Sequence, residues 1–76
     1  MNTLTLKLPS VSAVKDFTAK ISKLEGDFDI GNGRYIVDAR SIMGIFSLDL
    51  SKPLTLTIHT ENPDEVIKAL NEFIVK

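Results

Sequence analysis

The chain has 76 residues, 43% of them hydrophobic and 25% charged, which is the profile of one globular domain with a small core. A formal net charge of −1 gives no basic field for nucleic acid or membrane surfaces, and no apolar run approaches the roughly 20 residues of a membrane-spanning helix. The absence of cysteine excludes disulfides and thiol chemistry, and a single histidine removes the usual zinc arrangements, so we expect a cytoplasmic domain over residues 1–76 without metal or cofactor.

The first predicted elements are a strand and a helix. Residues 3–8 alternate leucine with threonine or lysine, which predicts a half-buried strand. Ser10 or Ser12 is expected to cap the helix that follows, and this helix should end near Gly26. Its apolar stripe has three- and four-residue spacing and consists of Val11, Val14, Phe17, Ile21 and Leu24.

The dipeptide Asn32-Gly33 predicts the turn of a β-hairpin, because this pair tolerates the positive φ angles of a two-residue type I′ turn. Such a turn fixes the register of the strands on either side. Four apolar side chains should then share one face, with Ile30 opposite Tyr35 and Phe28 opposite Val37.

The segment between Arg40 and Leu50 is rich in apolar residues, and its periodicity fits two structures. As a helix, it would begin at a cap on Ser41. As a strand, it would alternate Phe46, Leu48 and Leu50 with polar residues.

A further strand and a helix complete the chain. Residues 54–60 alternate like the first strand, with threonine and His59 on the polar face. Asn62 as a cap, Pro63 in the first turn and two acids after it mark the start of the last helix. The apolar stripe of this helix continues to the C-terminus and consists of Val66, Ile67, Leu70, Phe73 and Ile74.

Each predicted strand has one apolar face and each helix has one apolar stripe. A two-layer, open-faced α+β sandwich buries the apolar faces of the strands and the apolar stripes of the helices together, with the helices on one side of an antiparallel sheet. If the segment between Arg40 and Leu50 is helical, the element order is β-α-β-β-α-β-α.

The sequence Ser41-Ile-Met-Gly-Ile-Phe-Ser-Leu48, preceded by Arg40 and the hairpin, resembles the second helix of the HPr family. These are the histidine-containing phosphocarrier proteins of the bacterial phosphoenolpyruvate:sugar phosphotransferase system. Ser22-Lys-Leu24 matches the end of the family's first helix in the same register, while the turn at 51–53 is slightly shorter than the family's loop. The resemblance implies a four-stranded sheet in the order 1-4-2-3 with three helices on one face.

The resemblance also shows which residues of the family are missing. In active members, a histidine at the start of the first helix takes phosphate from Enzyme I and passes it to sugar-specific partners. In the register of this chain, that histidine falls on Ser10, the nearby arginine on Ser12 and the proline after it on Ala13. A phosphoserine ester is a low-energy product that cannot replace a phosphohistidine. We therefore predict that the chain has no histidine phosphocarrier activity and no catalytic residue.

Ser41 has two interpretations. It could be a helix cap and nothing more. In Gram-positive members of the family, however, the serine at this position is phosphorylated by an ATP-dependent kinase, and the product binds a transcriptional regulator. A phosphate is physically well placed at the start of a helix. The resemblance thus makes an HPr kinase and a catabolite regulator candidate partners.

Three apolar residues of the same segment have two interpretations as well. If Ile45 and Leu48 face the sheet, then Ile42, Met43 and Phe46 remain partly outside the core. In the family these positions form the docking surface for Enzyme I and other partners, and a methionine beside an aromatic suits an adaptable contact. In a domain this small, Ile42 and Phe46 could equally complete the core.

The remaining polar residues are interpreted as surface groups. His59, the only imidazole, is expected on a solvent-facing strand surface, far from Ser10 and without a carboxylate partner indicated nearby in the sequence. The acids at four other positions are interpreted as solvated, namely Asp27, Asp29, Asp49 and Asp64.

The sequence leaves two functions open. The first is an HPr-like, noncatalytic regulatory paralogue that binds protein partners of the phosphotransferase system, with or without a phosphate on Ser41. The alternative is a small α+β ligand-binding or oligomerisation module unrelated to phosphotransfer. Strand order separates them, because the alternative would have the order 4-1-3-2.

Overall fold

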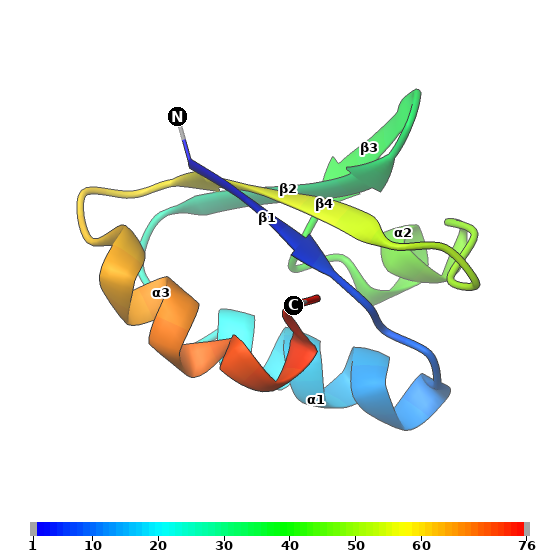
Figure 1. Cartoon of the computed structure of the whole chain (residues 1–76), viewed down its shortest axis with the longest axis horizontal. Coiled ribbons are helices and arrows are strands. Elements are labelled where there is room, and N and C mark those ends of the chain that lie inside the picture. Colours follow the sequence, from blue (N-terminus) through cyan, green and yellow to red (C-terminus); the bar gives the residue numbers. More distant parts are fainter. Residues whose placement is uncertain (1, 76) are drawn as a thin grey trace.

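Four strands form one antiparallel sheet in the computed structural model, which describes residues 2–75. The order is β1-β4-β2-β3, as expected for the HPr fold and unlike the 4-1-3-2 order of the alternative. Met1 and Lys76, the expected ends of the domain, lie outside the described residues. The strands in Figure 1 are β1 (Asn2–Leu6), β2 (Asp27–Asn32), β3 (Tyr35–Asp38) and β4 (Leu54–His59).

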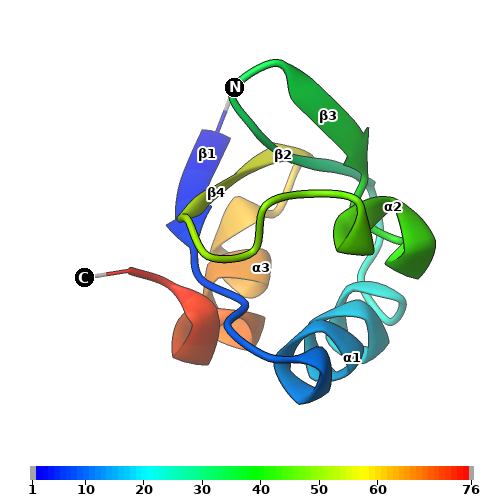
Figure 2. The same cartoon turned by 90° about the vertical axis from the view of Figure 1, so that its right-hand side faces the viewer.

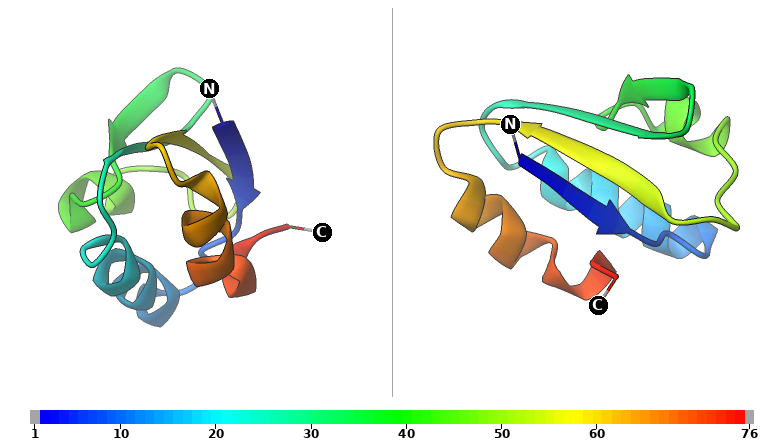
Figure 3. Two further views of the ribbon diagram at one scale, coloured as in Figure 1. Left: turned by 90° about the vertical axis from the view of Figure 1, so that its left-hand side faces the viewer. Right: turned by 45° about the horizontal axis from the view of Figure 1, so that its top comes forward.

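Within residues 2–75, three α-helices cover one face of this sheet and leave the other face open (Figures 1 and 3). They are α1 (Val11–Ile21), α2 (Ile42–Phe46) and α3 (Pro63–Ala69), and the short 3₁₀-helix η1 (Asn71–Phe73) follows α3. The predicted α+β sandwich with the order β-α-β-β-α-β-α is thereby confirmed. No helix in this part of the chain combines the length and the apolar character that crossing a bilayer requires.

The core lies between the sheet and the helices, and no polar or charged residue among those described is buried in it. Phe17 of α1 and Phe73 of η1 meet edge to face, with ring centroids 5.8 Å apart. The strands contribute Leu6, Phe28, Ile30, Leu54, Leu56 and Ile58, and the helices and loops contribute Leu8, Val14, Phe17, Ile21, Ala39, Ile45, Leu48, Val66, Leu70 and Phe73.

Both long helices end earlier than their apolar stripes predict. α1 ends at Ile21, and Gly26, with φ of 113°, turns the chain toward β2. α3 ends at Ala69, and its predicted cap, Asn62, makes no side-chain capping hydrogen bond. Beyond η1 the chain returns to β1, where the N–H of Val75 donates to the backbone of this strand. The N–H groups of Phe73 and Ile74 donate within η1, to Leu70 and Asn71, and that of Val75 donates to Thr5, so none of them extends α3.

The hairpin forms as predicted, but its predicted register is wrong. Its turn is Gly33-Arg34, so Ile30 opposes Val37 instead of Tyr35. Gly33 has a φ of 60° and is the only residue of this turn with a positive φ, which fits a type II′ turn. The shift carries Tyr35 past the end of the core, where its side chain is 74% exposed.

Gly31→Ala should destabilise the protein more than Gly33→Ala. A Cβ atom on Gly31 would lie 2.1 Å from the carbonyl oxygen of Tyr35, inside the β2–β3 ladder, whereas a Cβ atom on Gly33 meets no atom within 4 Å. Gly33→Ala introduces no clash, and its left-handed φ should lower the free energy of unfolding by about 1–2 kcal/mol. Urea unfolding followed by circular dichroism measures both free energies. Equal losses would contradict the register of β2 against β3.

Candidate functional site

The start of α2 is fixed by two consecutive residues. The Oγ atom of Ser41 accepts a hydrogen bond from the N–H of Gly44, at 3.2 Å. Nη2 of Arg40 donates to the carbonyl oxygen of Leu24, at 2.9 Å, and the guanidinium lies 5.2 Å from the centroid of the Phe28 ring. The helical interpretation of this segment is therefore confirmed. Contacts to the loop between α1 and β2 hold the helix in place.

α2 buries one side and exposes the other. Ile45 is fully buried and Leu48 is 7% exposed, as predicted for the side that faces the sheet. Ile42 is half-buried against the core, whereas Phe46 is 37% exposed and Met43 is 76% exposed. Phe46 therefore does not complete the core. We call Ile42, Met43 and Phe46 the α2 surface.

The start of α1 lies at the same end of the molecule as α2 (Figures 1 and 2). Ser10 is its cap, since the Oγ atom accepts a hydrogen bond from the N–H of Ala13 at 3.1 Å, and Ser12 is exposed. Val11 was predicted in the apolar stripe but is 58% exposed, because it is the first residue of the helix and lies beyond the core. A cap on Ser10 is the sequence signal that could have identified Val11 as the first, exposed residue of the helix.

His59 lies at the other end of the sheet. It is the last residue of β4. The first residue of β4, Leu54, pairs with Leu6 at the end of β1, and from there the chain continues into α1. Five steps along β4 at about 3.3 Å per residue span roughly 16 Å. His59 is exposed, as predicted, but Nε2 lies 3.3 Å from Oδ2 of Asp29. Local sequence pattern does not reveal this partner, because Asp29 lies on another strand.

The acids interpreted as solvated are not all alike. Asp27 and Asp64 are exposed, and Asp29 is the half-buried partner described above. Oδ1 of Asp49 accepts hydrogen bonds from the hydroxyl of Ser51, at 2.5 Å, and from its N–H, at 3.1 Å. These bonds hold the pKa of Asp49 below its ordinary value, and the bond from the hydroxyl has the larger effect. Asp49 therefore orders the loop after α2.

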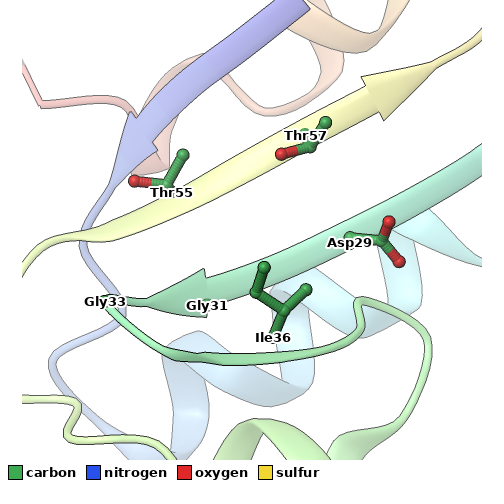
Figure 4. Close-up of a pocket in the computed structure, with 6 residues that line it drawn as sticks. All are labelled: Asp29, Gly31, Gly33, Ile36, Thr55 and Thr57. Carbon is green, nitrogen blue, oxygen red and sulfur yellow. The ribbon is translucent and has the colours of Figure 1, made fainter.

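The open face of the sheet carries a hollow of about 200 Å³ (Figure 4). It offers one carboxylate, two hydroxyl groups and an aliphatic side chain, without a nucleophile and base in contact. Among residues 2–75, no three His, Asp or Glu side chains lie close enough together to hold a metal ion. The hollow is lined by Asp29, Gly31, Gly33, Ile36, Thr55 and Thr57.

Comparisons with known proteins agree with this architecture. A family model described as "PTS HPr component phosphorylation site" matches residues 11–76. The crystal structure of HPr-C-His from Thermoanaerobacter tengcongensis is similar, with 26% sequence identity, a TM-score of 0.80 and coverage of 95% of this chain and 89% of that chain. Phosphocarrier protein HPr from Bacillus anthracis is similar too, at 22% identity, a TM-score of 0.74 and coverage of 97% and 94%.

A histidine-containing phosphocarrier protein from Mycoplasma has the same fold, with 13% identity, a TM-score of 0.76 and coverage of 93% of this chain and 89% of that chain. A search of curated protein sequences finds no match. The family match spans most of the chain and covers all three α-helices and three of the four strands, while β1 lies before the matched residues. The chain therefore belongs to the HPr family of the phosphoenolpyruvate:sugar phosphotransferase system and has its phosphocarrier fold.

Proposed function

We propose that this chain binds protein partners of the phosphotransferase system through the α2 surface and does not carry phosphate on a histidine. The observation that carries the proposal is the start of α1, where Ser10 stands at the position that the register from Ser22-Lys-Leu24 gives to the phosphorylated histidine. Its hydroxyl is engaged as a helix cap. Partner binding without group transfer is a regulatory role, and we place it in the cytoplasm, where the family acts.

The chemistry of the relay explains why Ser10 cannot substitute. The relay requires an N–P bond that forms and breaks reversibly near neutral pH, and imidazole supplies it. A serine ester holds its phosphate too firmly to pass it on. With Ser12 in place of the arginine, no guanidinium stands there to bind the phosphoryl oxygens.

His59 cannot take over the relay from its position in the fold. A donor that docks on the start of α1 and on α2 would present its phosphate at one end of the sheet, while the imidazole lies at the other end. The imidazole also sits on the open face of the sheet, whereas α1 and α2 cover the opposite face.

The α2 surface supports the binding role. Met43 and Phe46 are presented by a helix that is held in place through buried Ile45, and α1, whose first residue is the exposed Val11, begins at the same end of the molecule. Exposed methionine and phenylalanine side chains form adaptable contacts with a protein partner. Members of the family act through such contacts with other phosphotransferase proteins.

Incubation with phosphoenolpyruvate and Enzyme I should leave the chain unphosphorylated, whereas an active HPr in the same reaction becomes phosphorylated. The triple variant Ser10→His, Ser12→Arg, Ala13→Pro should gain an acid-labile phosphate, because it returns the relay residues to a scaffold whose docking surface is intact. Intact-mass spectrometry before and after acid treatment measures both. An acid-labile phosphate on the unmodified chain, lost again in His59→Ala, would refute the proposal.

Met43→Ser should change the free energy of unfolding by less than about 0.5 kcal/mol, and Phe46→Ser by about 1 kcal/mol, because both side chains are partly exposed. Ile45→Ala should cost about 2–5 kcal/mol, because its side chain is buried. Urea unfolding measures these values, and calorimetry with Enzyme I measures binding.

Both serine variants should bind Enzyme I more weakly than the unmodified chain. Tyr35→Ser is the matched control, since it removes an exposed apolar side chain outside the α2 surface and should not affect this binding. Unfolding of the Met43 and Phe46 variants would show that these residues belong to the core. Unchanged affinity would show that the partner docks elsewhere.

A second candidate role adds regulation at Ser41. Its side chain is exposed at the start of α2, directly before the α2 surface. A phosphate there would place two negative charges beside Met43 and compete for the N–H of Gly44, which now binds the Ser41 hydroxyl. Phosphorylation would therefore change both the charge of the α2 surface and the cap of its helix.

Treatment with an HPr kinase and ATP should increase the intact mass of the chain by one phosphate. Ser41→Ala should abolish the increase, while the matched cap variant Ser10→Ala should keep it. Each substitution removes one capping hydroxyl at a cost of about 1 kcal/mol, so a loss of stability alone would affect both alike. An unchanged mass of the unmodified chain beside a phosphorylated HPr control would exclude this role.

A further inference from the structure

The outer edge of β3 is the open edge of the sheet. β4 and β2 have a strand on each side, and the C-terminal segment partly covers the outer edge of β1, where Ile74 bridges Leu6 and the N–H of Val75 donates to Thr5. Within residues 2–75, no strand pairs with β3 on the side away from β2. The two opposite views in Figures 2 and 3 show no ribbon along that side.

The residues of β3 alternate in the direction of their backbone groups. The two-residue turn makes Tyr35 and Val37 the residues that exchange hydrogen bonds with β2, and the N–H of Ala39 continues this pattern with the carbonyl oxygen of Phe28, at 2.9 Å. Within β3, the backbone groups that point outward therefore belong to Ile36 and Asp38, and Arg34 is the turn residue directly before the strand, two positions from Ile36.

These three residues are self-complementary. In an antiparallel pair centred on Ile36, this residue faces its own copy, and Arg34 of each chain faces Asp38 of the other. A shift by two residues in either direction loses both ion pairs. Charge complementarity thus selects one register. The carbonyl oxygen of Asp38 already accepts from Ser41 at 2.9 Å, which leaves its second lone pair for the partner strand.

The side chains of β3 match this pairing. Ile36 is 68% exposed and Tyr35 is 74% exposed, on opposite faces of the strand. Edge strands are usually protected by charges that repel a second strand, by proline or by a bulge. Here the flanking charges are opposite in sign, so in the centred register they attract.

We propose that two copies of this chain associate through β3, antiparallel about a two-fold axis at Ile36, and join their sheets into one. The contact is isologous, so it closes after two chains and does not propagate into fibres. It is also short, and it buries less than the roughly 1,200 Å² of stable interfaces, so the dimer is weak. The proposal does not depend on the function of the α2 surface.

Analytical ultracentrifugation at low salt, from micromolar to millimolar concentration, tests the dimer. The unmodified chain should dimerise at the upper end of this range. Arg34→Asp and Asp38→Arg should each remain monomeric, because each variant sets like charges against each other. An equimolar mixture of the two variants should dimerise again, because one chain then presents two acids to the two bases of the other.

Recovery on mixing also separates lost pairing from lost folding. Oδ1 of Asp38 accepts a hydrogen bond from the N–H of Arg40, at 2.9 Å, so Asp38→Arg carries some structural cost, but a misfolded variant could not recover. Met43→Lys is the control on another surface and should leave dimerisation unchanged. The proposal is overturned if the unmodified chain is monomeric at every concentration. It is also overturned if the single variants dimerise as the unmodified chain does, or if the variants are folded but do not dimerise on mixing.

Discussion

The pairing of β2 with β4 is the constraint on which the rest of the structure depends. No local turn joins these strands, yet they form the centre of the sheet, with β1 on one side and the β2–β3 hairpin on the other. At roughly 25 cal/mol per Å² of apolar surface, burial of their shared face stabilises this long-range pairing. Two cross-strand pairs of buried side chains form that face, Phe28 with Ile58 and Ile30 with Leu56.

The same pairing separates the two places where phosphate chemistry could occur. β4 carries the chain from the end of the molecule that holds α2 and the start of α1 to the end that holds His59. In the proposed function, His59 therefore does not replace a histidine at the start of α1. α2 has only five residues, too few to be stable alone, so the α2 surface exists because Arg40, Ser41 and Ile45 attach it to the fold.

Local pattern predicted the elements well, because alternating apolar residues mark β1 and β4 and a capping serine, Ser10 or Ser12, marks the start of α1. It failed where a distant contact decides. The C-terminal stripe did not continue α3, because the chain turns into η1 and then pairs with β1 through Val75. The hairpin register failed for a local reason, because the positive φ falls on Gly33 as the first turn residue. In the site, exposure of the α2 surface was one of two interpretations of the segment, whereas the contact of His59 with Asp29 depends on strand pairing that no local pattern contains.

The most direct test of the account is a nuclear magnetic resonance titration of the isotope-labelled chain with unlabelled Enzyme I in the presence of phosphoenolpyruvate. The central claim is that the α2 surface binds without taking phosphate. The amide signals of Met43, Phe46 and their neighbours should shift, while the imidazole signals of His59 and the ³¹P spectrum of the chain stay unchanged. A phosphohistidine signal on the chain, or shifts confined to the open face of the sheet, would contradict the account.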